Sequence, residues 1–210
     1  MKFVDLSIGA DDEKELVKII SLASRMGYAA LGVRPSLYKE ALEGAAKAGV
    51  IIYPKVTVEA KERRELVKFL SGLKLDTIAS VRPYNLEVYR YAARLKRVDM
   101  VRLNPSARLL PDRSTLNLFR SKGGGALEVP LRPLLSGEWD IRDLREIIVR
   151  GTSRGLRIVI TSDAMSASEL WHPDHIIGLI SSLGLPSSVA LMGLTSAPGF
   201  VISRRGLRPP

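Results

Sequence analysis

Short runs of apolar and β-branched residues alternate with amphipathic segments along the whole chain. The runs that predict strands cover residues 3–8, 28–33, 50–58, 77–81, 100–103, 126–131, 158–161 and 189–192. The segments in which apolar residues recur at helical spacing cover residues 11–26, 36–48, 60–71, 85–96, 114–122, 142–153 and 173–183. Such alternation favours parallel strands joined by crossover helices.

This inventory predicts a fold of the α/β class, a TIM-like (β/α) barrel of eight short strands. The chain has 210 residues, whereas typical barrels need about 250, so an open doubly wound sheet stays as the structural alternative. We expect one barrel domain over residues 1–202, because the composition does not shift midway, and a basic flexible tail over residues 203–210.

Charge changes this picture from a generic barrel to one with a polyanionic partner. Lys and Arg outnumber Asp and Glu by 32 to 22, which gives a net charge of +10 and a pI near 10.0. Such a surface attracts nucleic acid, although positive charge also serves solubility alone. The absence of cysteine excludes disulfides, thiolate catalysis and cysteine-based zinc sites. Apolar runs too short for a bilayer and the lack of a signal-peptide pattern lead us to expect a cytoplasmic protein without membrane contact.

Arginines recur at the predicted strand ends. Proline follows directly after Arg34, Arg82 and Arg132, and Arg102 precedes a looser version of the same pattern. Because the carboxyl ends of barrel strands share one face, these four side chains are expected around one anion-binding mouth. The alternative is that they pair with the inward carboxylates of Asp5 and Glu128 and only satisfy buried charge.

Basic residues also cluster on two predicted helices. One group is Lys61, Arg63, Arg64 and Lys68, and the other is Arg90, Arg94, Lys96 and Arg97, interleaved with Tyr84, Tyr89 and Tyr91. Cations mixed with aromatic rings are typical of RNA-binding surfaces, but a solvated helix face looks the same in sequence.

Further basic residues crowd a loop-rich stretch that includes Arg108 and Lys122 and ends at Gly123–Gly125. These glycines either let the backbone approach a phosphate or form a turn, and they lack the pattern of a P-loop.

Candidates for catalysis are few. The only two histidines, His172 and His175, flank Pro173 and Asp174 at a predicted helix start, where a capping role competes with a zinc site. Asp163 lies at a strand end, the usual place for a catalytic group in a barrel, but it could equally form a turn.

Three stretches resemble the thirty-kilodalton subunit family of ribonuclease P, which includes archaeal protein component 3. They are Phe3–Ser7, the strand and turn Leu127–Leu135 with its Leu-Arg-Pro-Leu-Leu sequence, and Ile158–Ala164 followed by a proline-opened helix that ends at Gly184. The resemblance follows the order of nearly the whole chain. Between Asp11 and Arg97 it rests on pattern more than on residues.

Barrels of this family look like relatives of metal-dependent phosphoesterases of the histidinol phosphatase type, whose first strand carries Asp-Leu-His-x-His. In this chain the corresponding residues read Asp5-Leu6-Ser7-Ile8-Gly9. Serine and glycine thus replace both metal-binding histidines, so we expect no metal site and no catalytic residue in this chain.

The resemblance implies a non-catalytic, RNA-binding subunit of the endoribonuclease that removes the 5′ leader from precursor tRNA. It implies partnership with the ribonuclease P RNA and with protein component 2, in a two-plus-two assembly, and Mg²⁺ held by the RNA for the cleavage. From strand-end geometry we expect RNA contacts at Arg34, Arg82, Arg102, Arg108, Lys122 and Arg132.

Two other functions remain open at this stage. One is a phosphoesterase-like barrel enzyme that binds a small phosphorylated substrate with the strand-end arginines, although the chain offers few metal ligands. The other is a structural interaction module without affinity for RNA, for which binding to a protein partner would not depend on salt.

Overall fold

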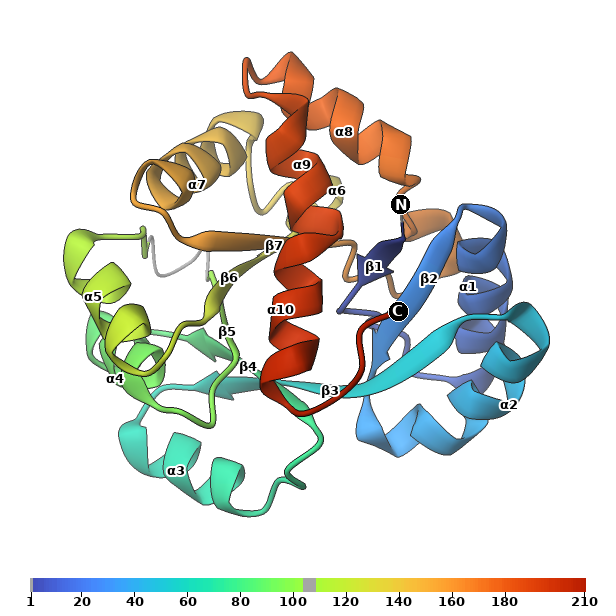
Figure 1. Cartoon of the computed structure of the whole chain (residues 1–210), viewed down its shortest axis with the longest axis horizontal. Coiled ribbons are helices and arrows are strands. Elements are labelled where there is room, and N and C mark those ends of the chain that lie inside the picture. The colour runs from blue at the N-terminus through green and yellow to red at the C-terminus, as the bar shows by residue number, and fades with distance from the viewer. Residues whose placement is uncertain (1, 104–108) are drawn as a thin grey trace.

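We describe the fold from a computed structural model, which covers residues 2–103 and 109–210. In that part of the chain, seven parallel strands form one sheet in the order of the sequence. The strands are β1 (Phe3–Asp5), β2 (Tyr28–Val33), β3 (Ile51–Ala60), β4 (Ile78–Pro83), β5 (Met100–Arg102), β6 (Ala126–Pro130) and β7 (Arg157–Thr161). Because each strand pairs with the next one along the chain, the connecting helices surround the sheet as in a barrel (Figure 1).

The helices connect these strands or follow the last of them. They are α1 (Glu13–Arg25), α2 (Tyr38–Ala48), α3 (Arg63–Ser71), α4 (Leu86–Arg94), α5 (Arg113–Ser121), α6 (Arg132–Leu135), α7 (Ile141–Ser153), α8 (Pro173–Ser182), α9 (Ser187–Leu194) and α10 (Ser196–Arg204), with 3₁₀ turns η1 (Pro35–Leu37) and η3 (Ala167–Glu169). α1 shows why they form: Asp12 caps its first turn, and Leu16, Ile20 and Ala23 bury one face. None of the described helices is both long and apolar enough to cross a membrane.

The barrel closes at its carboxyl end, just beyond β1 and β7. The Asp163 N–H donates to the Ser7 carbonyl at 2.9 Å, the Gly9 N–H donates to the Ala164 carbonyl at 2.8 Å, and Ile8 forms a parallel bridge with Ala164. Beside this seam, α9 and α10 pack against β7 and β1. The barrel prediction is therefore confirmed, and the open doubly wound sheet is not the arrangement observed.

The predicted eighth strand is wrong, because residues 189–192 lie inside α9. A short apolar run does not by itself separate a strand from a buried helix. Here the run contains alanine, leucine and methionine, which favour helices, and Gly193 lets the helix lie close to β7. A Cβ at that glycine would come within 2.9 Å of the Ile160 side chain.

The C-terminal residues differ from the expected tail, since residues 203–210 begin inside α10. The Arg205 Nε donates to Asp99 Oδ1 at 2.7 Å, and the Tyr53 hydroxyl donates to the Arg208 carbonyl at 2.5 Å. These bonds place the segment against the amino end of the barrel, and the domain boundary at residue 202 and the flexibility of the tail stay predictions.

The barrel interior is apolar at its amino end and polar at its carboxyl end. Every strand contributes one residue to the apolar layer, namely Val4, Ala30, Tyr53, Ile78, Met100, Ala126 and Val159. Val201 and Ile202 of α10, the red helix across the front of Figure 1, close this layer. Because inward positions recur every second residue, the next layer brings Lys55, Ser80 and Glu128 inward, all of them buried.

Candidate functional site

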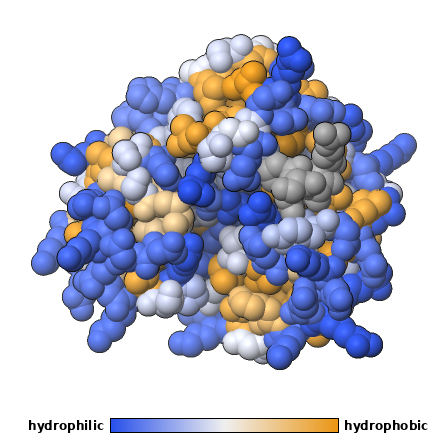
Figure 2. Space-filling model, turned by 180° about the vertical axis from the view of Figure 1, so that it is seen from behind, coloured by the Kyte–Doolittle hydropathy of each residue, from blue (hydrophilic) through white to orange (hydrophobic). Residues whose placement is uncertain are grey.

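The four strand-end arginines meet at one mouth, as predicted. A cavity of about 380 Å³ opens at the carboxyl ends of the strands, and Arg34, Arg82, Arg102 and Arg132 all line it. Figure 2 shows the molecule from the end opposite α10, with hydrophilic residues in blue across the centre of the face. The common direction of parallel strands is sufficient to bring these side chains together.

A buried ion pair forms the floor of the mouth. The Lys55 Nζ lies 2.9 Å from Glu128 Oε1 and also donates to the hydroxyls of Ser7, at 2.9 Å, and Thr57, at 2.6 Å. The Ser80 hydroxyl donates to the other oxygen of Glu128. Burial alone would raise the pKa of Glu128, but the charges of Lys55 and Arg102 lower it below its usual value.

A second pair lies just above the floor. The Arg102 guanidinium donates to both carboxylate oxygens of Asp163, with 2.9 Å between Nη1 and Oδ1, and the Ser7 hydroxyl donates to the same Oδ1 at 3.1 Å. Burial would raise the pKa of Asp163, yet Arg102 holds it below its usual range. Asp163 has a φ of +57°, a left-handed backbone conformation that few non-glycine residues adopt, and its side chain lines the mouth.

The three remaining arginines form a partly exposed rim. Their side chains are 46%, 24% and 39% exposed for Arg34, Arg82 and Arg132. The pairs are Arg34 with Asp11, Arg82 with Glu59 at 2.9 Å and Arg132 with Glu169 at 3.2 Å. The arginines thus gather at a mouth, as predicted. The alternative that they pair with Asp5 and Glu128 is wrong, because the partners of the rim arginines are Asp11, Glu59 and Glu169 and that of Arg102 is Asp163.

Asp5 does not take the expected part in this network. Its Oδ1 accepts the Ser7 N–H and its Oδ2 accepts the Ser162 N–H, both at 3.0 Å, across the seam between β1 and β7. Burial raises the pKa of Asp5 to about 6, because these hydrogen bonds only partly offset the cost of a buried charge. Asp5 thus links β1 to the segment after β7, and its described partners are the backbone amides of Ser7 and Ser162 and the Ser162 hydroxyl rather than an arginine.

One of the predicted RNA contacts, Lys122, lies away from the mouth. Lys122 lies at the end of α5, near the amino end of the barrel, where its Nζ donates to the carbonyls of Leu95 at 3.2 Å and Val98 at 2.7 Å. Burial lowers its pKa to about 7. These carbonyls follow α4, so the buried Lys122 caps that helix end. Arg108 lies outside the described residues.

The comparison with protein families decides the relationship, because the sequence profile of the family "RNase P subunit p30" matches residues 2–209. The chain belongs to this family. It is 32% identical to ribonuclease P protein component 3 of Aeropyrum pernix over 200 residues, which cover 91% of this chain and 92% of that protein. It is 28% identical to component 3 of Methanothermobacter thermautotrophicus over 225 residues, which cover 99% and 91%. The family predicted from the sequence is confirmed.

Solved structures agree with the fold of this p30-family barrel. A chain in a cryo-EM structure of archaeal ribonuclease P with mature tRNA matches with a TM-score of 0.74 at 15% identity, over 96% of this chain and 90% of that one. An amidohydrolase matches with a TM-score of 0.61 at 11% identity, over 98% and 75%. Identities this low show the fold alone, and the predicted kinship with histidinol phosphatase barrels stays a prediction.

In this p30-family chain, the residues around Gly9 leave little space for a metal-binding side chain at that position. A Cβ at Gly9 would lie 2.8 Å from the Met165 sulfur and 3.0 Å from the Asp163 carbonyl oxygen. The carboxylates of Glu128 and Asp163 already bind Lys55 and Arg102 respectively. Within the described residues, no three His, Asp or Glu side chains are grouped as metal ligands would be.

The two histidines lie at the start of α8. Pro173 is the first residue of this helix, as predicted, and His172 is its N-cap. The His172 Nδ1 accepts the Asp174 N–H at 3.2 Å. The capping role that we considered for this segment is therefore present in the structure.

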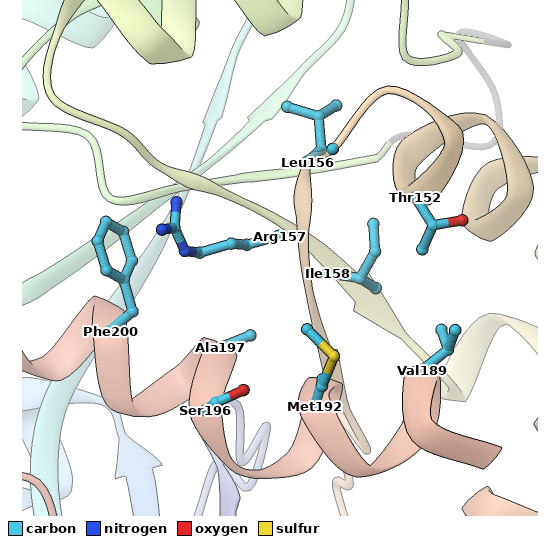
Figure 3. Close-up of a pocket in the computed structure, with 10 residues that line it drawn as sticks. Thr152, Leu156, Arg157, Ile158, Val189, Met192, Ser196, Ala197 and Phe200 are labelled. Carbon is cyan, nitrogen blue, oxygen red and sulfur yellow. The ribbon is translucent and has the colours of Figure 1, made fainter. Parts of the chain in front are cut away.

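A second cavity, of about 620 Å³, opens beside the barrel between the start of β7, the end of α7, α9 and α10 (Figure 3). Apolar side chains such as Ile158, Val189 and Met192 line it. The Arg157 guanidinium lies 3.7 Å from the centroid of the Phe200 ring. This cavity differs from the mouth, whose lining carries ion pairs.

Sequence reasoning missed Lys55, the central cation of the mouth. The available signal was a lysine inside the apolar run of β3, where a buried strand rarely carries a charge without a partner. The glycine triplet forms the turn between α5 and β6: Gly124 lies against Phe200, and its carbonyl accepts a hydrogen bond from Arg204.

Proposed function

We propose that this chain is a non-catalytic, RNA-binding subunit of ribonuclease P that assists the RNA subunit in removing the 5′ leader from precursor tRNA. The observation that carries the proposal is the family match over residues 2–209. The net charge of +10 supports it, because such a surface attracts the phosphate backbone of RNA.

The rim arginines are the proposed RNA contacts at the mouth. Arg34, Arg82 and Arg132 are partly exposed, and a phosphate can compete for a guanidinium whose carboxylate partner is itself solvated. Arg102 is more deeply buried on Asp163, so its part is to hold the rim in place and add positive potential. Contacts at Arg108 and Lys122 stay predictions, and Lys122 would first have to leave its helix-capping position.

Catalysis is assigned to the RNA rather than to this chain. The acidic groups of the mouth and its floor have partners: Glu128 binds Lys55, Asp163 binds Arg102, and Glu59 binds Arg82 and the Tyr84 hydroxyl. General acid–base or metal chemistry would require at least one of them to be released. Mg²⁺ held by the RNA would perform the phosphodiester cleavage, and the arginines would offset repulsion between RNA segments.

The proposed partners are the ribonuclease P RNA and protein component 2, in a two-plus-two assembly, with precursor tRNA reached indirectly. The similar chain in a structure of archaeal ribonuclease P with mature tRNA supports a ribonuclease P assembly, and component 2 and the two-plus-two stoichiometry stay predictions. We place the complex in the cytoplasm, where tRNA precursors of a cell without a nucleus are processed.

The test is cleavage of precursor tRNA by reconstituted ribonuclease P RNA at limiting magnesium. We expect this chain together with component 2 to restore cleavage, and we expect no cleavage by the two proteins without the RNA. Cleavage by this chain alone, or no rescue together with no RNA binding at low salt, would overturn the proposal.

A matched pair of variants tests the rim. Replacing Arg34, Arg82 and Arg132 by alanine one at a time should lower the salt dependence of RNA binding, with a change in slope of about 0.7 to 0.9 for each lost phosphate contact. The control is Arg25→Ala, which removes the same charge from the exposed last turn of α1.

A further inference from the structure

A row of cations and aromatic rings runs down the outside of the barrel from the mouth. We define the α3–α4 wall as Lys61, Arg63, Tyr84, Arg90, Tyr91 and Arg94. The Lys61 Nζ lies 5.5 Å from the centroid of the Tyr84 ring. The guanidinium carbons of Arg63 and Arg94 lie 5.3 Å and 5.0 Å from the centroid of the Tyr91 ring.

The local sequence explains why these side chains face outward. In α4, Val88, Tyr89 and Ala92 are buried against the barrel, so Arg90 and Arg94 fall on the outer face, and Tyr91 is half-buried, with part of its ring packed against the core. In α3, Glu62 and Glu65 form a capping box at the first turn. Backbone hydrogen bonds from Lys61 and Glu62, together with the charge of Lys61, lower the pKa of Glu65, so this carboxylate caps the helix and also offsets part of the positive charge beside it.

The wall keeps positive charge that the mouth does not. Arg63 pairs with Glu87 at 2.8 Å and Arg90 with Asp112 at 3.3 Å, and all of these side chains are 40% exposed or more. Within the described residues, no carboxylate pairs with Lys61 or Arg94 of the wall, or with Arg64 and Lys68 beside it.

The wall is concave around Tyr91. A cleft of about 490 Å³ is lined there by Arg63, Arg90, Tyr91 and Arg94, by Glu87, which pairs with Arg63, and by the apolar Leu86 and Leu118. The cleft thus combines a ring, several guanidinium groups and apolar contacts. At the mouth end, the Tyr84 hydroxyl donates to Glu59 at 2.6 Å, and Arg82 of the rim binds the same carboxylate, so wall and mouth are continuous.

We propose that the α3–α4 wall binds unpaired nucleotides of RNA, with bases stacked on Tyr91 and its flanking guanidinium groups and phosphates held by Arg90 and Arg94. This inference rests on the proposed function and adds the surface and the kind of RNA. Stacking requires open base faces, which unpaired nucleotides offer and a duplex hides. An acidic protein would satisfy the charges but would not need several stackable planes in one cleft.

Binding of a labelled oligouridylate about ten nucleotides long, within the usual size of single-strand sites, tests the proposal with the full chain. We expect Tyr91→Leu to weaken binding about tenfold, because stacking on one ring typically contributes about 1–3 kcal/mol. Tyr91→Phe should bind as the unchanged protein does, since the ring remains. Arg94→Ala should weaken binding and lower the salt slope by about 0.7.

Two controls separate stacking from general electrostatics and from unfolding. Arg25→Ala on α1 should bind like the unchanged protein, and thermal melting should show that Tyr91→Leu stays folded. Duplex RNA of the same length should bind equally to Tyr91→Leu and to the unchanged protein. The proposal is overturned if Tyr91→Leu weakens binding of duplex RNA as much as binding of oligouridylate. It is also overturned if Tyr91→Leu weakens binding of polyglutamate, which stands for an acidic protein, but not binding of oligouridylate.

The cleavage assay at limiting magnesium distinguishes this inference from the function beneath it. If the unchanged protein restores cleavage but Tyr91→Leu and Arg94→Ala bind oligouridylate as it does, the wall assignment fails and the subunit function stands. If the unchanged protein neither restores cleavage nor binds any RNA, the subunit function itself fails.

Discussion

The mouth of the barrel and the α3–α4 wall are both rich in basic side chains, but the surroundings of these side chains differ. At the mouth, Arg102 and Lys55 are buried against Asp163 and Glu128. On the wall, Arg94 lies over a tyrosine ring and has no carboxylate partner within the described residues. The comparison teaches that the number of arginines does not locate an RNA site, because a paired buried cation is committed to the fold and an unpaired exposed one is available to a ligand.

The largest expected effect comes from breaking the buried pair of the mouth. Glu128→Gln leaves the Lys55 cation without its counter-charge, so we expect the free energy of unfolding to fall by about 3–5 kcal/mol in urea denaturation. The matched change on the wall, Glu87→Gln, removes the exposed partner of Arg63 and should cost less than about 1 kcal/mol. Equal losses at the two positions would remove the distinction.

The next effect concerns the seam of the barrel and its dependence on pH. The pKa of Asp5 is raised from 3.8 to about 6 in the folded state. The folded protein therefore binds this proton more tightly, and the associated stability, roughly 3 kcal/mol, is present below pH ~4 and lost as the pH rises to ~6.

We expect the unfolding free energy of the unchanged protein to fall, relative to that of Asp5→Asn, as the pH rises over that interval, because asparagine cannot ionise. Asp163 and Glu128 act in the opposite direction, because their pKa values are lowered and their stabilisation is lost under more acidic conditions. Denaturation in urea at several pH values measures the difference, and a constant difference from pH ~4 to ~6 contradicts the role of Asp5.

A smaller effect compares packing around two glycines. Gly9→Ala places a Cβ 2.8 Å from the Met165 sulfur and close to the Asp163 backbone, so it should cost about 1–3 kcal/mol. Gly72→Ala, at the end of α3, meets only the Phe69 carbonyl oxygen at an ordinary 3.7 Å and should be neutral or slightly stabilising. Thermal melting of both variants checks this. Equal melting temperatures would show that the residues around Gly9 accommodate the extra methyl group, against the prediction.

The smallest expected effect on stability comes from the rim. Arg132→Ala removes a partly exposed pair with Glu169 and should change the unfolding free energy by less than about 1 kcal/mol. Its effect on RNA binding should exceed its effect on folding. A large loss of stability would instead group Arg132 with the committed cations Lys55 and Arg102.

Much of the mouth could be predicted from sequence, because parallel strands fix where their ends lie. Arg34 and Arg132 come just after β2 and β6, and Arg82 lies at the end of β4, and the carboxyl ends of parallel barrel strands share one face. Lys122 shows the limit of that argument. It is the C-cap of α5, which runs back from the mouth, so it lies at the amino end of the barrel. A helix of this length before Lys122 indicates that the residue cannot lie at the mouth.

The partners of these side chains could not be predicted, since pairing depends on distances across the barrel. Arg102 and Asp163 are 61 residues apart in sequence, and no local pattern links them. The choice between strand and helix for residues 189–192 failed for a related reason: four apolar residues satisfy either element, and packing on β7 decides.

The position of α10 has a consequence for synthesis on the ribosome. All seven described strands precede this helix in the chain, yet Val201 and Ile202 close the apolar layer to which every strand contributes. A nascent chain whose strands have all emerged from the ribosome therefore still exposes that layer to water at the amino end of the barrel. Burial of the barrel interior is complete only when α10 has emerged from the exit tunnel and docked.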